Sequence, residues 1–548
     1  IRVGMNSGVV VVRAIDNDLH MDLSAIGETT HLAARMEEMA PPGSVWLTRA
    51  TFALAEPVID ARPLGARSVR GRHAPVEIFE LTSARAMRRI EVAAMRGLTR
   101  FVGRELEMNE LSRIQQRMLT GHGRVTAVVG EVGIGKSRLL FEFVHAPTVS
   151  GCMVFETGTV SYGQSTPYFP VLKLLRQQFL LKEDEGAEVV RERVTTTLAN
   201  LGLEHAVAPL QALLGVLPED SAFATYDPLR RRELTLEALR GLVLRLCGVG
   251  PVLLVVEDLQ WIDSESQELL DRLVQSMPTV RLHLVVNYRG EYQHGWGGLS
   301  YYNQVRLDPL APEAVDALLG MMLGDAPEIA PLKRLLSERT DGNPFFLEES
   351  VRELVDGGSL IGEPGHYRTT GVVAPHVPPT LEGVLASRID RLPRVEKHLL
   401  QCASVIGRDV PLDLLEALAN LPKADLTAAL HHLQQAEFVF ERVTAREPEY
   451  SFKHSLTHEV AYHSLLHEQA RMLHGATVAA IERLHTDQLP LHLDALVHHA
   501  VLGEVWPKAV DYLRRAGAAA FARGSVAESL ARYEQALSFA GRLDTSRE

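Results

Sequence analysis

A glycine-rich octapeptide that ends in lysine and serine constrains this chain more than any other feature. Residues 130–137 read GEVGIGKS, which matches the pattern G-x-x-x-x-G-K-[ST], and they stand between an apolar run at 125–129 and a helical pattern over 138–144. Glycines let a loop bring its N–H groups against phosphate oxygens, and the helix that follows adds partial positive charge at its N-terminus. The motif therefore predicts a phosphate-binding loop on a parallel α/β sheet and a nucleotide-binding chain.

Each residue type in this loop has an expected contact. The glycines are expected to take φ > 0, the lysine to reach the β- and γ-phosphates, and the serine hydroxyl to bind Mg²⁺. A glycine-rich turn without phosphate is the alternative, and the Lys-Ser pair behind a predicted strand argues against it. The predicted cofactor contacts of the loop are Gly130, Gly133, Gly135, Lys136, Ser137 and Arg138.

A second element supplies the carboxylates that such a site needs. Residues 251–263 read PVLLVVEDLQWID, in which the apolar stretch 252–256 predicts a buried strand that ends at Glu257 and Asp258. Ligands of open α/β sheets bind at the carboxyl ends of the strands, so this pair is expected beside the loop. We assign Glu257 to the magnesium shell and Asp258 to activation of the attacking water. The unusual order Glu-Asp leaves an exchange of the two roles open.

Arg289 follows a third predicted strand at 282–286. Its place after that strand favours a sensor of the γ-phosphate, and an ordinary surface arginine is the alternative. Together with Lys136, Glu257 and Asp258, Arg289 completes the predicted catalytic set.

Composition fits a globular chain of several domains. At 548 residues and 46% hydrophobic content, the chain is expected to hold roughly three to five domains. The net charge of −13 argues against nonspecific binding to nucleic acid, because the phosphate backbone attracts clustered cations. Three dispersed cysteines predict neither a disulfide framework nor a zinc site, and no apolar run approaches ~18 residues. We expect a cytoplasmic protein without membrane contact.

Several segments in a fixed order resemble the signal-transduction ATPases with numerous domains, which are regulatory relatives of the AAA ATPases. They are GLTRFVGRELEMNEL at 97–111, the glycine-rich loop, EDLQWID, the strand before Arg289 and DGNPFFLEE at 341–349. The resemblance covers about 100–470. It implies an ATPase core at 100–300, a helical lid at 301–394 and a winged helix at 395–470.

The resemblance also implies roles for residues outside the loop. Val102, Gly103 and Arg104 match the segment beside the adenine, and Pro344 matches a proline that packs on the base, with an ordinary turn as the alternative. His454 stands where relatives place a winged-helix histidine that contacts bound diphosphate. The predicted recognition segment LTAALHHLQQAEFV carries no Lys or Arg, so packing on the ATPase is favoured over DNA binding.

A histidine-rich stretch suggests a metal site, which we do not adopt. His454 and His458, and then His463 and His467, are each spaced four residues apart, as on one helix face. The run HEVAYH is not the zinc motif H-E-x-x-H, because its second histidine lies five residues on and points ~140° away. Satisfied or exposed histidines are the favoured interpretation.

Ahead of the ATPase segment, MDLSAIGETTHLAARMEEMAPPGSVWLT at 21–48 resembles the C-terminal part of a class III nucleotidyl cyclase domain. The resemblance covers residues 1–82 and implies a partial α+β, ferredoxin-like fold. Arg35 matches the family's transition-state arginine, His31 replaces the asparagine one helical turn earlier, and Ser24 stands at the base-reading position. The family's metal-binding aspartates belong to strands before Ile1. We therefore expect that this segment alone cannot cyclise ATP and that His31 weakens the longer parent.

The remaining segments are interpreted as a linker at 83–99 and a helical region at 471–548. Small residues at 516–520, followed by Tyr533, Ala536 and Leu537, are typical of tetratricopeptide helix pairs, which need at least about three copies to bury a core. We expect the array to continue beyond this sequence, and the missing initial methionine also predicts a fragment. A single helical hairpin that caps the winged helix is the alternative.

Together these patterns predict a P-loop α/β ATPase with a winged helix and the start of an all-α repeat, behind a partial cyclase domain. This layout resembles the soluble adenylyl cyclase family. The expected function is an ATP-binding, slowly hydrolysing signalling switch that regulates or accompanies cyclic AMP synthesis, with ATP or ADP and Mg²⁺ as cofactors.

The expected partners are a protein or peptide on the repeats and a second copy of the chain on ATP binding. Neither nucleic acid nor membrane is expected to bind directly. Two alternatives stay open, a transcription regulator of the maltose-regulator type and an active adenylate cyclase whose ATPase is a scaffold.

Overall fold

The computed structural model describes most of the chain and divides it into two compact units. The first unit holds Ile1–Leu98 together with Glu441–Glu449, and the second holds Thr99–Phe440 together with Tyr450–Glu548. The predicted linker at 83–99 lies largely outside the described residues. The structure describes residues 2–8, 11–17, 20–26, 28–55, 59–69, 75–84, 99–159, 167–181, 185–370, 378–443, 448–523 and 525–545.

Among the described residues of the first unit, four strands form a sheet in the order β1-β4-β6-β5. Strands β1 and β4 are parallel, and β6 is antiparallel to its neighbours β4 and β5. Helix α1 buries Leu32 and Met36, which share one helix face, against Trp46 and Ile78 of the sheet. The elements are β1 (Val3–Met5), α1 (Glu28–Met39), β4 (Val45–Thr48), α2 (Arg49–Ala55), β5 (Ile59–Arg67), β6 (Val76–Ala84) and the antiparallel hairpin of β2 (Val11–Asn17) and β3 (His20–Ile26).

This α+β arrangement confirms the partial α+β fold that was predicted for the N-terminus. The linker prediction is corrected at its start, because residues 83 and 84 still belong to β6.

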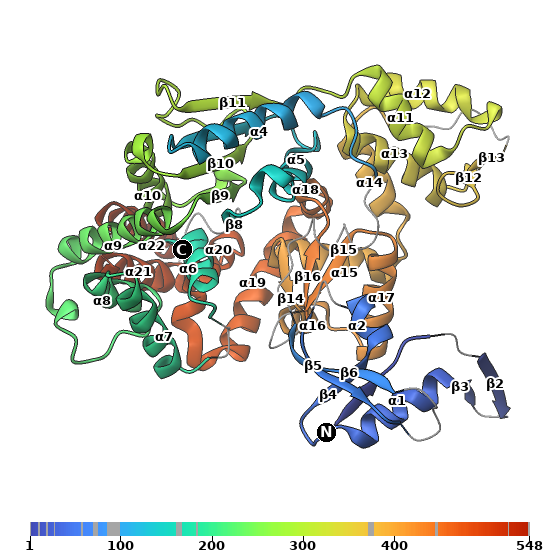
Figure 1. Ribbon diagram of the computed structural model, residues 1–548, viewed down its shortest axis with the longest axis horizontal. Helices are drawn as coiled ribbons and strands as arrows, with labels where there is room; N and C mark the ends of the chain where they lie inside the picture. Colours follow the sequence, from blue (N-terminus) through green and yellow to red (C-terminus); the bar gives the residue numbers. More distant parts are fainter. Residues whose placement is uncertain are drawn as a thin grey trace. The chain divides into compact units, whose positions relative to one another are not determined.

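A parallel sheet forms the centre of the predicted ATPase core within the second unit (Figure 1). Within the described residues its order is β11-β7-β10-β9-β8, and every neighbouring pair is parallel. Parallel pairs need crossover connections, and helices on the two faces of the sheet supply those between β7 and β8, β8 and β9, and β9 and β10. The strands are β7 (Arg124–Val129), β8 (Met153–Gly158), β9 (Val252–Glu257), β10 (Leu282–Tyr288) and β11 (Tyr302–Arg306).

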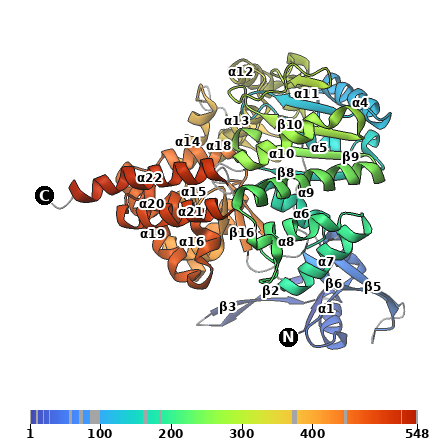
Figure 2. The ribbon, with the colours of Figure 1, turned by 90° about the vertical axis from the view of Figure 1, so that its left-hand side faces the viewer.

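Alternating residues of these strands fill two separate cores. Leu254 and Leu284 point into the core shared with α6, α9 and α10, whereas Leu253 and Val285 point into the core shared with α4 and α5. Both faces are therefore apolar, as a parallel sheet requires, and the result is three layers (Figure 2). The helices are α4 (Glu105–Leu119), α5 (Lys136–Val144), α6 (Phe169–Gln178), α7 (Ala187–Asn200), α8 (Val207–Leu213), α9 (Pro228–Val249) and α10 (Ser264–Gln275).

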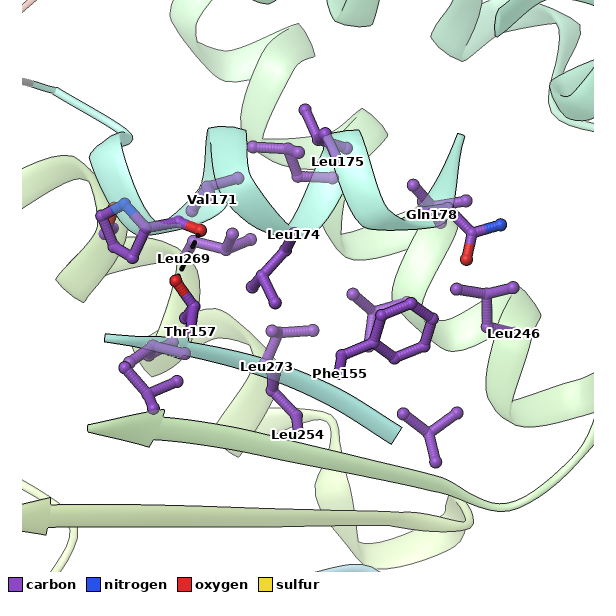
Figure 3. Close-up of a pocket in the computed structure, with 18 of the residues that line it drawn as sticks. Phe155, Thr157, Val171, Leu174, Leu175, Gln178, Leu246, Leu254, Leu269 and Leu273 are labelled. Atoms are coloured by element: carbon purple, nitrogen blue, oxygen red, sulfur yellow. Dashed lines mark hydrogen bonds between the residues drawn. The ribbon is translucent and has the colours of Figure 1, made fainter. Parts of the chain in front are cut away.

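A small apolar cavity of about 70 Å³ lies between strands β8 and β9 and helices α6, α9 and α10. Figure 3 shows Leu174 of α6 pointing toward the strands, with Phe155 and Leu273 nearby. Thr157, a polar residue of the lining, donates its hydroxyl to the Pro170 carbonyl at 3.2 Å. Its lining is otherwise almost wholly apolar, so the cavity offers water few hydrogen-bond partners.

The lid consists of α11, α12 and α13 with a short hairpin, and it buries its own apolar core. Arg388 of α14 joins this lid to the winged helix. Its guanidinium pairs with Glu349 and, at 3.0 Å, with Asp356, and donates to the Ala436 carbonyl at 2.7 Å. The elements are α11 (Pro312–Leu323), α12 (Ala330–Thr340), α13 (Pro344–Asp356), β12 (Leu360–Ile361), β13 (Arg368–Thr369) and α14 (Leu381–Arg391).

The winged helix packs helices α15 to α18 around a small sheet in the order β14-β16-β15. The histidine-rich stretch is not one helix, because α18 ends at His463 and a new helix begins at His467. The second predicted i, i+4 pair is therefore wrong. The elements are α15 (Arg394–Ile406), β14 (Asp409–Pro411), α16 (Leu412–Ala419), α17 (Lys423–Gln435), β15 (Val439–Val443), β16 (Pro448–Phe452) and α18 (Ser455–His463).

The C-terminal region is helical, and α20, α21 and α22 lie side by side (Figure 2). Ala516 and Ala520 of α21 are buried, which lets α22 approach closely, and the Gly517 carbonyl accepts a hydrogen bond from Ser529 at 2.8 Å. None of the helices that the structure describes is long and apolar enough to cross a lipid bilayer. The helices are α19 (His467–Leu484), α20 (Leu493–Leu502), α21 (Trp506–Arg523) and α22 (Val526–Thr545).

His283 is a fully buried polar residue in the middle of the parallel sheet. Its Nδ1 donates to the Gln115 side-chain oxygen at 2.7 Å, and its Nε2 accepts from the Thr126 hydroxyl at 2.8 Å. Burial, together with the charge of Arg124, lowers the pKa of His283 to about 3. The neutral imidazole thus links α4, β7 and β10, and it cannot be protonated without breaking a buried hydrogen bond.

We expect the second unit to lose stability in acid through this group. The folded-state pKa of His283 lies below the ordinary value of 6.5, so the unfolded chain binds the proton first. The stabilisation is complete above pH 6.5 and falls by about 1.4 kcal/mol per pH unit as the pH drops toward 3. Denaturant titrations at pH 6 and pH 4 of the wild type and of His283→Gln measure this. Equal pH slopes in the two proteins would contradict it.

Candidate nucleotide site

The strand register brings the glycine-rich loop and the acidic pair to the same edge of the sheet. Val129 pairs with Tyr288, and Val286 pairs with Val256, so β10 separates the end of β7 from the end of β9. Two strand spacings amount to roughly 10 Å, which a nucleotide and its metal can span. The pKa of Lys136 is accordingly influenced by the charges of nearby groups, which are Asp258, Arg289, Glu131 and Glu257.

The loop has the backbone geometry that the motif predicts at two of its three glycines. Gly133 and Gly135 have φ of +78° and +101°. Gly130 is not among the described residues with positive φ, so that part of the prediction is wrong. Glycine is required at position 130 by close packing instead, because a Cβ there would lie 2.9 Å from the Ile134 side chain and 3.0 Å from the Leu307 carbonyl.

Lys136 folds back onto its own loop. Its Nζ donates to the carbonyls of Gly130 and Glu131, both at 2.8 Å. Burial lowers the pKa of Lys136 to about 8, and the attraction of Asp258 opposes the shift. The exposed Ser137 follows in the first turn of α5, whose N-terminus no side chain of the described residues caps. Lysine, hydroxyl and free helix N-terminus form a cradle that fits an anionic phosphate chain.

Asn287 binds both residues of the acidic pair. The sequence analysis did not identify it. This wholly buried side chain accepts from the Asp258 backbone N–H at 2.7 Å and donates to the Glu257 carboxylate at 3.2 Å. Asp258 takes the left-handed conformation with φ of +58°, a strain that is typical of functional sites. A lone amide in the otherwise apolar end of a strand, level with the acidic pair, is the signal that could have identified Asn287.

The winged helix supplies a counter-charge to Asp258 and another to Arg289. Arg408 donates to the Asp258 carboxylate at 3.1 Å, and Arg289 donates to Glu459 of α18 at 3.2 Å. Arg289 therefore lies near the predicted site but points its guanidinium at the winged helix. Neither Arg408 nor Glu459 carries a local signal, because each is an ordinary charged residue in the sequence.

A turn of the lid contacts the glycine-rich loop directly. Asn343 caps α13 by accepting from the Phe345 and Phe346 N–H groups, and its amide donates to the Val132 carbonyl at 2.9 Å. Pro344 is the first residue of α13, and the ring of Phe345 lies 3.8 Å from that of His454. The turn that holds Pro344 thus contacts the loop through Asn343 and Phe345, and His454 packs on Phe345. Asn343 stood inside the quoted DGNPFFLEE segment.

The segment predicted beside the adenine also lies against the loop and lid. Gly103 has φ of +68°, and a Cβ there would come within 2.5 Å of Ala314 in α11. The buried Arg104 donates to the Ile134 carbonyl at 3.1 Å and pairs with Glu107. Val102 packs against the lid core. Arg138, by contrast, donates hydrogen bonds to Glu142 and to the Thr99 carbonyl. Its guanidinium therefore binds the segment where the ATPase core begins.

The residues of the cyclase fragment lie in the first unit. His31 is exposed on α1, and Arg35, one turn later on the same helix, pairs with Glu38. Ser24 belongs to β3, where its backbone pairs with Arg13 of β2, and its side chain lies outside the described features.

The donor set fits Mg²⁺ bound together with a nucleotide. Ser137, Glu257 and Asp258 supply the hard oxygen ligands that Mg²⁺ prefers. In the part of the chain that the structure describes, no three His, Cys, Asp or Glu side chains are grouped so that they could hold a metal ion. Phosphate oxygens of a nucleotide would therefore have to complete the shell, which is common for Mg²⁺.

Two family models match separate parts of the chain. Residues 100–286 match the AAA ATPase domain, and residues 1–83 match the adenylate and guanylate cyclase catalytic domain. An uncharacterised protein of Rhizobium meliloti (strain 1021) is 25% identical over 562 residues, which covers 100% of this chain and 53% of that protein. The chain thus spans about half the length of this curated relative.

Two solved structures are similar to different parts of the chain. A signal transduction ATPase with numerous domains and a tetratricopeptide repeat sensor, from Pyrococcus horikoshii, aligns over 80% of this chain and 58% of its own at 13% identity and a TM-score of 0.44. An adenylyl cyclase from P. aeruginosa aligns over 15% of this chain and 42% of its own at 32% identity and a TM-score of 0.14.

Replacing Gly133 by alanine is expected to separate the loop from the lid. The added Cβ would lie 2.9 Å from both the Asn343 oxygen and the Phe345 side chain, in a backbone with positive φ. We expect at least a tenfold loss of nucleotide affinity in equilibrium titrations. Gly215→Ala is the matched control, because Gly215 has φ of +73° and no neighbour within 4 Å. Equal affinities for the two variants would contradict the lid contact.

Proposed function

Because this chain joins part of an adenylate and guanylate cyclase catalytic domain to an AAA ATPase domain, we propose that it is a nucleotide-controlled signalling switch. In this proposal the ATPase binds ATP or ADP, hydrolyses ATP slowly and regulates or accompanies cyclic nucleotide synthesis by the longer parent. The helical region at the C-terminus would bind a protein or peptide, and ATP binding would promote self-association.

One observation carries the proposal. The winged helix holds two residues of the predicted catalytic set at once, Asp258 through Arg408 and Arg289 through Glu459. A scaffold with no nucleotide-dependent motion would have no need to occupy both. Packing of this kind supports a closed state in which hydrolysis is held back.

Several of the predicted site residues have a part in this switch. Lys136 and the N-terminus of α5 would bind the phosphates, and Pro344 and His454 would hold a diphosphate in the closed state. Ser137, Glu257 and Asp258 would hold Mg²⁺, which neutralises phosphate charge when it is bound. Arg289 would leave Glu459 for the γ-phosphate. A ligand shifts such an equilibrium only by its differential affinity for the two states, so ATP and ADP must contact Arg289 differently.

The two alternatives rest on weaker observations. A transcription regulator would need a basic helix-turn-helix past residue 548. Within this chain, α17 carries Lys423 at its start and otherwise no Lys or Arg. An active cyclase with a scaffold ATPase remains a separate proposal for the parent, whose cyclase part here holds His31 where the family has asparagine. The cytoplasm is the proposed location.

Lys136→Ala is expected to abolish nucleotide binding. The ammonium is the one loop side chain that can neutralise phosphate charge, so its loss costs at least about 100-fold in affinity. Mass analysis of nucleotide carried through purification provides the measurement, with co-purified ADP expected in the wild type. Lys397→Ala, which removes a partly exposed lysine paired with Asp390, is the control. An empty wild type that ignores ATP and ADP in titrations would contradict the proposal.

The longer parent protein is expected to make cyclic AMP under control of the ATPase. Lys136→Ala in that protein should change cyclic AMP output several-fold, because the switch can no longer exchange nucleotide. The assay compares the variant with wild type at equal protein concentration and with manganese present. Undiminished and unaltered output in the variant would favour the scaffold alternative.

A further inference from the structure

The two ion pairs between the winged helix and the ATPase core have opposite polarity. The core supplies an acid, Asp258, and a base, Arg289, and the winged helix answers with Arg408 and Glu459. The side chains of these pairs are 20–36% exposed, so water screens them only in part. The winged helix thus matches the charge of both core residues at the same time.

Arg408 occupies one of the two oxygens of the Asp258 carboxylate. This residue stands between α15 and β14, and its guanidinium binds Oδ2 of Asp258 at 3.1 Å. The other oxygen, Oδ1, accepts a long hydrogen bond of 3.4 Å from Gln260. On the neighbouring residue, Asn287 occupies Oε2 of Glu257. The free carboxylate oxygens that a hard cation requires are therefore reduced while the winged helix is docked.

We propose that Arg408 and Mg²⁺ compete for Asp258, so that a docked winged helix and a magnesium-loaded site exclude each other. This inference rests on the proposed nucleotide switch and adds its trigger. The docked form would bind a nucleoside diphosphate without metal, and Mg²⁺ would promote release of the winged helix. Glu459 contributes indirectly, since its pair with Arg289 holds the winged helix, and thereby Arg408, in place.

Linkage gives the size and the reciprocity of the effect. If docking weakens Mg²⁺ binding by a certain factor, then Mg²⁺ weakens docking by the same factor. A partly exposed, charge-assisted pair of this kind corresponds to roughly a fivefold change in an equilibrium constant. Mg²⁺ strengthens ADP binding by a certain factor. Removing Arg408 or Glu459 should therefore increase that factor by about fivefold.

The test measures the affinity of a fluorescent ADP derivative at a series of Mg²⁺ concentrations, together with hydrogen exchange of α18. The proteins are the wild type, Arg408→Gln, Glu459→Gln and the control Lys397→Gln, whose charge change lies in the same winged helix at the Asp390 pair. Thermal unfolding checks that each variant is folded. Arg408→Lys serves as the conservative variant that restores a positive charge without the planar guanidinium.

Glu459→Gln separates docking from simple charge effects. Removing a negative charge near the site would weaken Mg²⁺ binding if only local Coulomb forces acted. If the winged helix is released instead, both Arg408→Gln and Glu459→Gln should increase about fivefold the gain in ADP affinity that Mg²⁺ produces. Both should also speed hydrogen exchange in α18. We expect Lys397→Gln to behave as wild type and Arg408→Lys to fall between wild type and Arg408→Gln.

The outcomes distinguish the two levels of the argument. If the wild type binds no nucleotide at any Mg²⁺ concentration, the proposed function fails. If the wild type binds ADP tightly but its Mg²⁺ dependence equals that of Arg408→Gln, or if Glu459→Gln weakens the Mg²⁺ effect, the competition is overturned and the nucleotide site stands.

Discussion

The register of three parallel strands, β7, β10 and β9, is the constraint on which the rest of the structure depends. It places the glycine-rich loop and the acidic pair about two strand spacings apart. Asn287 on the middle strand then binds both Glu257 and the Asp258 backbone. A shift of one residue in this register would turn Asn287 to the other face of the sheet and leave the acidic pair without its buried partner.

Segments far apart in the sequence meet around this edge of the sheet. Asn343 of the lid binds the loop through Val132, Arg104 binds it through Ile134, and Arg408 reaches Asp258 from the winged helix. Each contact uses a polar side chain on a backbone carbonyl or a carboxylate. The lid and the winged helix are themselves joined through the buried Arg388, so a movement of the winged helix would be transmitted to the lid.

The sequence predicted the parts of the site that local physics determines. The P-loop, the apolar strand before Glu257 and the helix predicted over 138–144 depend on neighbouring residues. The parallel sheet and the cyclase fragment were confirmed. The positive φ predicted for Gly130 was wrong. Glycine is needed there because a Cβ would clash with Leu307, and not because the chain turns. Arg408 and Glu459 lie 150 and 170 residues from their partners, and nothing in their local pattern selects which charge they will meet.

The apolar cavity has a mechanical consequence for this arrangement. It lies beneath Leu254 and Val256, on the strand that carries the acidic pair, and α6 closes its other side. Dispersion contacts are missing there, so the sheet is more compressible at this point than a fully packed interior. Hydrostatic pressure that compresses this hollow would reach Glu257 and Asp258 by deforming their own strand rather than by disturbing the loop that faces them.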